Sequence, residues 1–266
     1  MKYNTDINII GSIPDYHLIF KAMPLLMDTE GNGPSELKKI LVTDNEFSFR
    51  TEGSRRRFLR VLNSTFVYQN HEINLFGSKV IELLSDNETS QSLVFFWLFS
   101  LNNKLFYEIN RDVFLKFYFL GRAELPKSDI IAYLKDKFNN NPDMKGLWSE
   151  KTIDVIARKY LATLTRLQLL EGVKRKSYCF VRVSDELLVI LLYLMYFRND
   201  RELNVLNDEF LNFSFIAKES IIERLKRIGK KDWMKMNFTG TGITIEPLFD
   251  INNLANVIFR RKQSEI

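Results

Sequence analysis

Four arginines stand close together in the segment Gly53–Arg60, which reads GSRRRFLR. Apolar residues at helical spacing behind them predict a helix that starts at Ser54. The start of a helix carries free backbone N–H groups and the positive end of the dipole, so cations there are unfavourable without an anion. Arginine at this place can bind phosphate oxygens or the edge of guanine. The cluster indicates nucleic-acid contact, against the alternative of a solvated basic face; its members are Arg55, Arg56, Arg57 and Arg60.

A second group of cations lies on a long helix and on the segment after it. The helix is predicted from Trp148 to about Leu170, with Ser149 as N-cap. The extended segment Val173–Val183 should form a ribbon, whose turn would suit phosphate contacts; an ordinary solubilising hairpin tip is the alternative. The helix carries Lys151, Arg158, Lys159 and Arg166 off its apolar face, and the ribbon adds Lys174, Arg175 and Lys176.

A third group lies on a helix predicted over Ala217–Ile228, and it has two explanations of similar weight. Its cations could contact nucleic acid, or they could be spent on ion pairs along the helix, because acids at positions 219, 223 and 232 are interleaved. The candidate contact residues are Lys218, Arg224 and Arg227.

Signatures of catalysis and of metal binding are missing from the sequence. One cysteine, Cys179, and two histidines, His17 and His71, leave little material for a disulfide framework or a His/Cys metal centre. Neither a GxxxxGK[ST] phosphate loop nor a GxGxxG fingerprint occurs. We therefore expect no enzymatic activity, no metal, no cofactor and no small-molecule substrate.

Composition favours a helical protein. The chain has 266 residues and a net charge of +5, with 22 Phe against 11 Gly and 6 Pro, so long side chains outnumber helix breakers. The first residues lack the apolar core of a signal peptide. The longest apolar runs, Leu93–Phe99 and Leu187–Phe197, fall short of the roughly 20 residues that span a membrane. We expect a cytoplasmic protein with no membrane contact.

The order of elements predicts a mainly α fold of tandem helix-turn-helix or winged-helix-like units with one or two small β-hairpins. A short helix, a turn and a longer basic helix recur, as in the second of these units, where a helix over Asp129–Phe138 capped by Ser128 precedes the long helix. The segments Gln91–Leu101 and Lys104–Leu120 should be buried scaffold. A hairpin is predicted across Thr239–Gly242. The expected domains are 1–88, 89–197 and 198–266.

Four stretches of the chain resemble the BrxA family of BREX phage-defence systems, and together they cover about the first 185 residues. The resemblance implies a small, largely helical protein with helix-turn-helix motifs beside positive surface. It also implies binding to double-stranded DNA and action beside a methyltransferase, an ATPase and other BREX proteins. The stretches are Tyr3–Thr5 leading to Ile10–Ser12, Ser54–Arg57, Phe114–Leu120 before Pro126, and Trp148–Thr152 through Leu169–Gly172.

Two functional hypotheses follow from these patterns. The first is a non-enzymatic accessory protein that binds double-stranded DNA, in which changing Arg55, Arg56 and Arg57 together to Ala should weaken binding without unfolding. The second is a protein–protein adaptor that docks other defence subunits through its winged-helix scaffolds. RNA binding is a weaker third hypothesis, because the strand spacing of Tyr178 and Phe180 favours core positions and leaves no aromatic platform for single strands.

Overall fold

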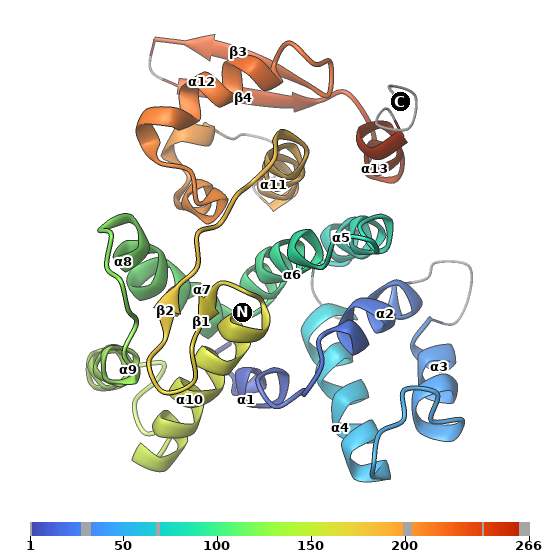
Figure 1. Ribbon diagram of the computed structural model, residues 1–266, viewed down its shortest axis with the longest axis vertical. Helices are drawn as coiled ribbons and strands as arrows, with labels where there is room; N and C mark the ends of the chain where they lie inside the picture. The colour runs from blue at the N-terminus through green and yellow to red at the C-terminus, as the bar shows by residue number, and fades with distance from the viewer. Residues whose placement is uncertain (1, 28–32, 68–69, 199–203, 241, 261–266) are drawn as a thin grey trace.

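The structure is a computed structural model that describes residues 2–27, 33–67, 70–198, 204–240 and 242–260, and helices dominate it (Figure 1). This confirms the predicted mainly α fold with small β-hairpins. The α-helices are α1 (Asp6–Ile10), α2 (His17–Leu26), α3 (Gly33–Lys38), α4 (Glu52–Leu62), α5 (His71–Leu83), α6 (Glu88–Asn102), α7 (Lys104–Ile109), α8 (Lys116–Phe119), α9 (Lys127–Asn140), α10 (Glu150–Arg166), α11 (Asp185–Arg198), α12 (Lys218–Ile228) and α13 (Ile251–Arg260).

Shorter helical segments and two antiparallel hairpins complete the described chain. The π-helical segments η1 (Lys39–Thr43), η2 (Asn63–Val67) and η3 (Asn110–Leu115) continue α3, α4 and α7, and η4 (Val205–Asn207) and η5 (Glu209–Ser214) are 3-10 helices. The hairpins pair β1 (Leu170–Glu171) with β2 (Ser177–Tyr178) and β3 (Met234–Thr239) with β4 (Gly242–Pro247).

The two hairpins differ in how well the sequence predicts them. The β3–β4 pair lies where the Thr239–Gly242 turn places it, with Met234 opposite Pro247. The first hairpin starts before Gly172 rather than at Val173, and its strands have only two residues each. Gly172 has φ +90°, and a Cβ there would collide with the Arg175 carbonyl oxygen. The residues from Val173 onward, which were expected to form the first strand, therefore belong to this tight turn.

Two predicted helix caps have different outcomes. Ser149 caps α10 as expected, because its hydroxyl accepts a hydrogen bond from the Thr152 N–H at 3.3 Å. The prediction of Ser128 as a cap is wrong, since α9 starts at Lys127 and Pro126 occupies the N-cap position in an extended conformation. The fixed φ of proline suits the entry to a helix, and Pro126 makes no side-chain hydrogen bond to the first turn.

The helix α6 is the centre of the core. Every residue from Gln91 to Asn102 is buried, which confirms the predicted scaffold role of this segment. The Phe95 ring lies 5.9 Å from that of Tyr16 in the N-terminal part, whereas Phe96 lies 5.6 Å from Phe213 near the C-terminal part. The Trp97 Nε1–H also donates to the Phe213 carbonyl at 2.9 Å. One helix therefore joins segments that are far apart in sequence.

Other contacts cross the expected domain boundaries at 88/89 and 197/198. α1 packs on α10 as well as on α4, and α13 packs on α5. In Figure 1, α5 and α6 run between the C-terminal elements at the top and the remaining helices below. The division into three domains stays a prediction. No helix within the described ranges has both the length and the apolarity to cross a bilayer.

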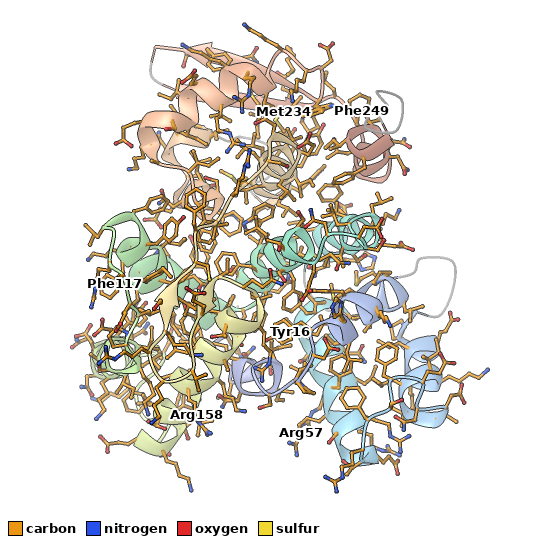
Figure 2. All side chains as sticks on the ribbon, in the orientation of Figure 1. Tyr16, Arg57, Phe117, Arg158, Met234 and Phe249 are labelled. Carbon is orange, nitrogen blue, oxygen red and sulfur yellow. The ribbon has the colours of Figure 1, made fainter. Side chains whose placement is uncertain are left out.

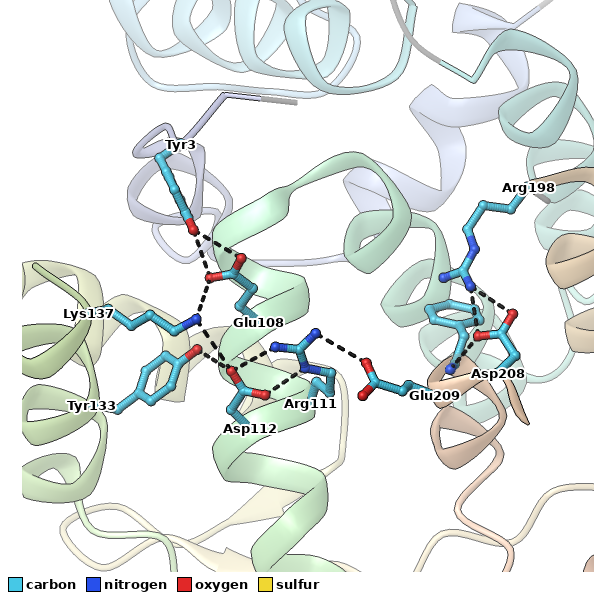
Figure 3. A network of polar contacts seen from close by, with 10 residues as sticks. Tyr3, Glu108, Arg111, Asp112, Tyr133, Lys137, Arg198, Asp208 and Glu209 are labelled. Carbon is cyan, nitrogen blue, oxygen red and sulfur yellow. Dashed lines mark hydrogen bonds and ion pairs between the residues drawn. The ribbon is translucent and has the colours of Figure 1, made fainter. Parts of the chain in front are cut away.

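A chain of polar contacts links the N-terminal segment to α7, η3 and α9 (Figure 3). The Tyr3 hydroxyl donates to Glu108, with 3.0 Å between Oη and each carboxylate oxygen. Lys137 Nζ lies 3.3 Å from Glu108 and 3.7 Å from Asp112. The Tyr133 hydroxyl donates to Asp112 at 2.6 Å. Burial and these carboxylates raise the pKa of both tyrosines above the usual value, so the hydroxyls stay protonated donors.

The same chain continues to the C-terminal elements. Arg111 binds its neighbour Asp112 at 2.6 Å and also reaches Glu209 on η5 at 3.2 Å. Close by, Arg198 at the end of α11 holds Asp208 at 2.7 Å. The Arg111–Glu209 pair joins elements that are 98 residues apart in the chain, and it orients η5 against η3.

The buried hydroxyl of Tyr160 gives a test of this packing. It donates to the Asn110 side-chain oxygen at 2.6 Å, at the first residue of η3, and both side chains are fully buried. Tyr160→Phe leaves that oxygen without a donor in the core, so we expect a loss of about 1–3 kcal/mol in unfolding free energy, measured by urea denaturation. Tyr196→Phe, whose hydroxyl has no partner among the described residues, is the control. Equal midpoints for the two variants would contradict the assignment.

Candidate nucleic-acid interface

The arginine-rich helix α4 starts at Glu52, two residues before the predicted position. Thr51 is the N-cap, and its hydroxyl accepts a hydrogen bond from the Ser54 N–H at 3.2 Å. Glu52 then places a carboxylate in the first turn, 2.6 Å from Arg56. The helix thus begins with Glu52 and Gly53, which the sequence placed in the preceding loop. The Glu52 carboxylate offsets the unfavourable position of the arginines at the positive end of the helix dipole.

Arg55 has a structural role in the folded chain. Its Nη1 donates to the Val42 carbonyl at 2.7 Å, and the side chain is half-buried. Val42 belongs to η1, so the guanidinium satisfies a carbonyl near the C-terminal end of that segment, where cations are favoured. One guanidinium nitrogen of Arg55 is therefore engaged within the fold, and its contact with nucleic acid stays a prediction.

Arg57 and Arg60 remain open to solvent. Both are exposed, and neither makes an ion pair within the described residues. Arg57 and Arg50 flank a cavity of about 400 Å³ with apolar walls that include Ile13 and Phe58. Sequence analysis missed Arg50, which lies in a loop without periodicity and is brought beside Arg57 only by the turn at 45–49.

The cations of α10 also divide into two kinds. Arg166 is half-buried and donates from Nη1 to the Gly11 carbonyl at 3.0 Å, which ties α10 to the end of α1. Lys159 is half-buried as well, and burial together with the neighbouring Arg158 and Arg166 lowers its pKa. Lys151 and Arg158 are exposed, without a salt bridge in the described part of the chain. The two acids of this helix near them are paired elsewhere, Glu150 with Lys135 and Asp154 with Lys127, each at 2.8 Å.

The tip of the first hairpin presents two of its three cations. Lys174 and Arg175 are exposed and have no partner in the described ranges. Lys176 turns back and donates to the Gly172 carbonyl. Burial and the nearby Arg166 lower the pKa of Lys176.

Arg57 and Arg158 lie at the same end of the molecule, opposite the β3–β4 hairpin (Figure 2). They come from α4 and α10, and both helices pack on α1. We call the exposed cations of these elements and of the first hairpin the basic face. Its members are Arg57, Arg60, Lys151, Arg158, Lys174 and Arg175.

The C-terminal cations are organised around one carboxylate. Asp185, the first residue of α11, accepts hydrogen bonds from Arg224 at 3.0 Å and from Arg227 at 2.6 Å, and Lys231 lies 3.3 Å away. Burial raises the pKa of Asp185, but the hydrogen bonds outweigh this and hold it well below its usual value. Arg224 and Arg227 are thus held by an ion pair, but their partner is Asp185 on another helix and not the interleaved acids at 219, 223 and 232 that the sequence suggested. Lys218 alone of the three predicted residues is exposed and unpaired among the described side chains.

The aromatic pair after the first hairpin departs from its predicted place. Tyr178 is half-buried and its ring stacks on Phe114 at 5.2 Å. Phe180 is 88% exposed, so the prediction of a core position is wrong for this residue. The chain is no longer in a strand at 180, and the alternation that supported a buried position does not apply. Among the described residues, no three His, Cys, Asp or Glu side chains gather as metal ligands would.

Comparison with known proteins gives one match. A family model described as BrxA matches residues 21–188, which confirms the resemblance seen in the sequence. The match includes α4, α10 and the first hairpin, and it ends within α11. No curated protein and no solved structure matches the chain.

The Asp185 cluster predicts a defined pH dependence of stability. Asp185→Asn removes the charge that holds two arginines, so we expect a loss of about 1–3 kcal/mol near neutral pH, measured by urea denaturation. Because the folded pKa lies below the unfolded value of about 3.9, this contribution is complete above that pH and disappears as the pH falls through the folded pKa. The difference in unfolding free energy between wild type and variant should therefore narrow below about pH 4.

Glu246→Gln, which breaks the exposed Lys235–Glu246 pair, is the control, and its unfolding free energy should differ little from that of wild type. A gap independent of pH would refute the assignment.

Proposed function

The chain belongs to the BrxA family and is a component of a BREX system, and on this basis we propose that it is a non-enzymatic accessory subunit that binds double-stranded DNA through the basic face. The observation that carries the proposal is that Arg57 of α4 and Arg158 of α10, which are exposed and make no ion pair among the described residues, lie at the same end of the molecule on two helices that pack on α1 (Figure 2). Cations that are held by acids or carbonyls contribute to folding, whereas these remain available to phosphates.

The order of elements from α9 to β2 also supports DNA binding. A shorter helix, a longer helix and a small hairpin follow one another, as in a helix-turn-helix with a wing. In such a unit the second helix enters the major groove and the hairpin tracks the backbone. Lys151 and Arg158 are seven residues apart on α10, hence about 10.5 Å along one side of the helix. Lys174 and Arg175 stand at the hairpin tip, where phosphate contacts would fall.

A double variant tests the basic face directly. Arg57→Ala with Arg158→Ala removes one cation from each helix without breaking a hydrogen bond or ion pair among the described residues. We expect about a tenfold or greater loss of affinity for a short duplex. Plotted against the logarithm of salt concentration, the slope of log K should become shallower by about 0.9 for each phosphate that the variant no longer neutralises. Titration by fluorescence anisotropy at several salt concentrations measures both.

The matched control is Lys226→Ala with Lys230→Ala, which removes the same charge from α12 and the residues after it, at the opposite end of the molecule, and likewise breaks no ion pair among the described residues. If both double variants weaken DNA binding equally, affinity depends only on net charge, and the assignment of DNA binding to the basic face is wrong. The triple change of Arg55, Arg56 and Arg57 is a poorer test, because Arg55 supports η1 and its replacement should also lower stability.

An adaptor role is the second candidate, and the cavity beside Arg57 favours it. Its apolar walls would accept an aliphatic or aromatic side chain of another BREX protein, with Arg50 and Arg57 close to acidic neighbours of that side chain. Co-purification of a BREX partner after nuclease treatment, combined with no duplex binding at low salt, would favour this function over DNA binding.

A further inference from the structure

A groove of about 820 Å³ separates the linker at 180–184 from α8 and α12. The linker leaves β2, passes α8 and enters α11 below α12, as Figure 1 shows. The groove shares no lining residue with the basic face. Residues on its walls include Phe119, Phe180, Arg182, Ser220 and Arg227.

Two aromatic rings are exposed in this groove. Phe180 is 88% exposed and Phe119 is 40% exposed. The backbone on both sides of Phe180 is held, since the Cys179 N–H donates to the Leu169 carbonyl at 3.1 Å and the Val181 N–H donates to the Tyr118 hydroxyl at 3.4 Å. Phe180 is therefore a ring on a fixed support that faces solvent. Together with Phe119, it offers an exposed aromatic surface onto which a flat ligand group can stack.

The charge of the groove is positive. Four cationic side chains line it against the two carboxylates of Asp185 and Glu186, which leaves a net charge of +2. Three of the cations converge on Asp185, so one negative charge holds three positive ones in place. The fourth, Arg182, is exposed and has no partner in the described ranges. The cations are Arg182, Arg224, Arg227 and Lys231.

We propose that this groove binds single-stranded nucleic acid, with bases stacked on Phe180 and Phe119 and a phosphate at Arg182. Exposed aromatic rings beside a positive track are the features with which proteins hold unpaired strands. The bases of a duplex are already stacked on one another and cannot reach such rings. An acidic peptide would match the charge, but it does not require a flat exposed ring. The site is additional to the proposed duplex interface and does not depend on it.

The test uses the full-length chain and a fluorescein-labelled oligothymidylate of about 12 nucleotides, within the length that single-strand binding folds cover. Phe180→Ala should weaken its binding about tenfold, the effect of removing one stacked base. Phe180→Trp keeps an aromatic ring at this position, so it should bind the oligonucleotide as wild type does. The fluorescence of the new indole should be quenched when the oligonucleotide is added. Val173→Ala is the matched control, because Val173 is 92% exposed on the first hairpin and lies outside the groove.

Two further arms separate this site from the duplex interface. Phe180→Ala should leave the affinity for a duplex unchanged, and the Arg57 and Arg158 double variant should leave oligothymidylate binding unchanged. Comparing the affinities for oligothymidylate and for an oligouridylate of the same length shows whether the groove prefers DNA or RNA. A preference for either strand supports the proposal that the groove binds single-stranded nucleic acid. The proposal is overturned if the wild-type protein binds neither oligonucleotide, or if Phe180→Ala binds both as tightly as wild type. It is also overturned if poly-glutamate displaces the oligonucleotide and the oligonucleotide does not quench the indole of Phe180→Trp.

Discussion

The burial of α6 is the constraint on which the other positions depend. A helix whose residues from Gln91 to Asn102 are all buried has no polar face to turn to water, so other elements must cover it on every side. The N-terminal helices cover Phe95, and α7, η3, η5 and α11 cover other sides of the helix. Its polar groups find partners inside the core, as when Asn102 and Asn74 exchange hydrogen bonds. α4 and α10, which are far apart in the chain, both pack on α1.

The cationic side chains of this protein fall into two groups, those that bind acceptors within the fold and those that remain open to solvent. Arg55 and Arg166 each donate to a carbonyl near the end of another helical element, and Arg224 donates to the Val183 carbonyl as well as to Asp185. Such contacts connect elements and reduce the charge available to a ligand. Other cations within a few residues of these, such as Arg57 and Arg158, have no such acceptor among the described residues. The pattern that matters for binding is therefore the set of cations left over after folding.

The two surfaces that we assign to nucleic acid differ in chemistry. The basic face carries cations on helices and a hairpin tip, which is suited to the regular phosphates of a duplex. The groove beside the linker adds exposed rings to a positive wall, which is suited to unpaired bases. The buried Phe213 ring and the hydrogen bond from Trp97 to the Phe213 carbonyl hold η5 against α6. A BREX subunit built in this way could hold both forms of DNA at separate sites.

The sequence alone determined the helical class, the buried runs around Phe96 and Leu191, the cap at Ser149 and the β3–β4 hairpin, because periodicity, capping and turn chemistry are local properties. It also placed the cations in three groups. The tertiary structure decided which of them are free, because the acceptors lie far away in the chain, as Gly11 does for Arg166 and Asp185 for Arg227. It also decided that Phe180 faces solvent, since strand alternation ends where β2 stops pairing, and only the fold sets that end.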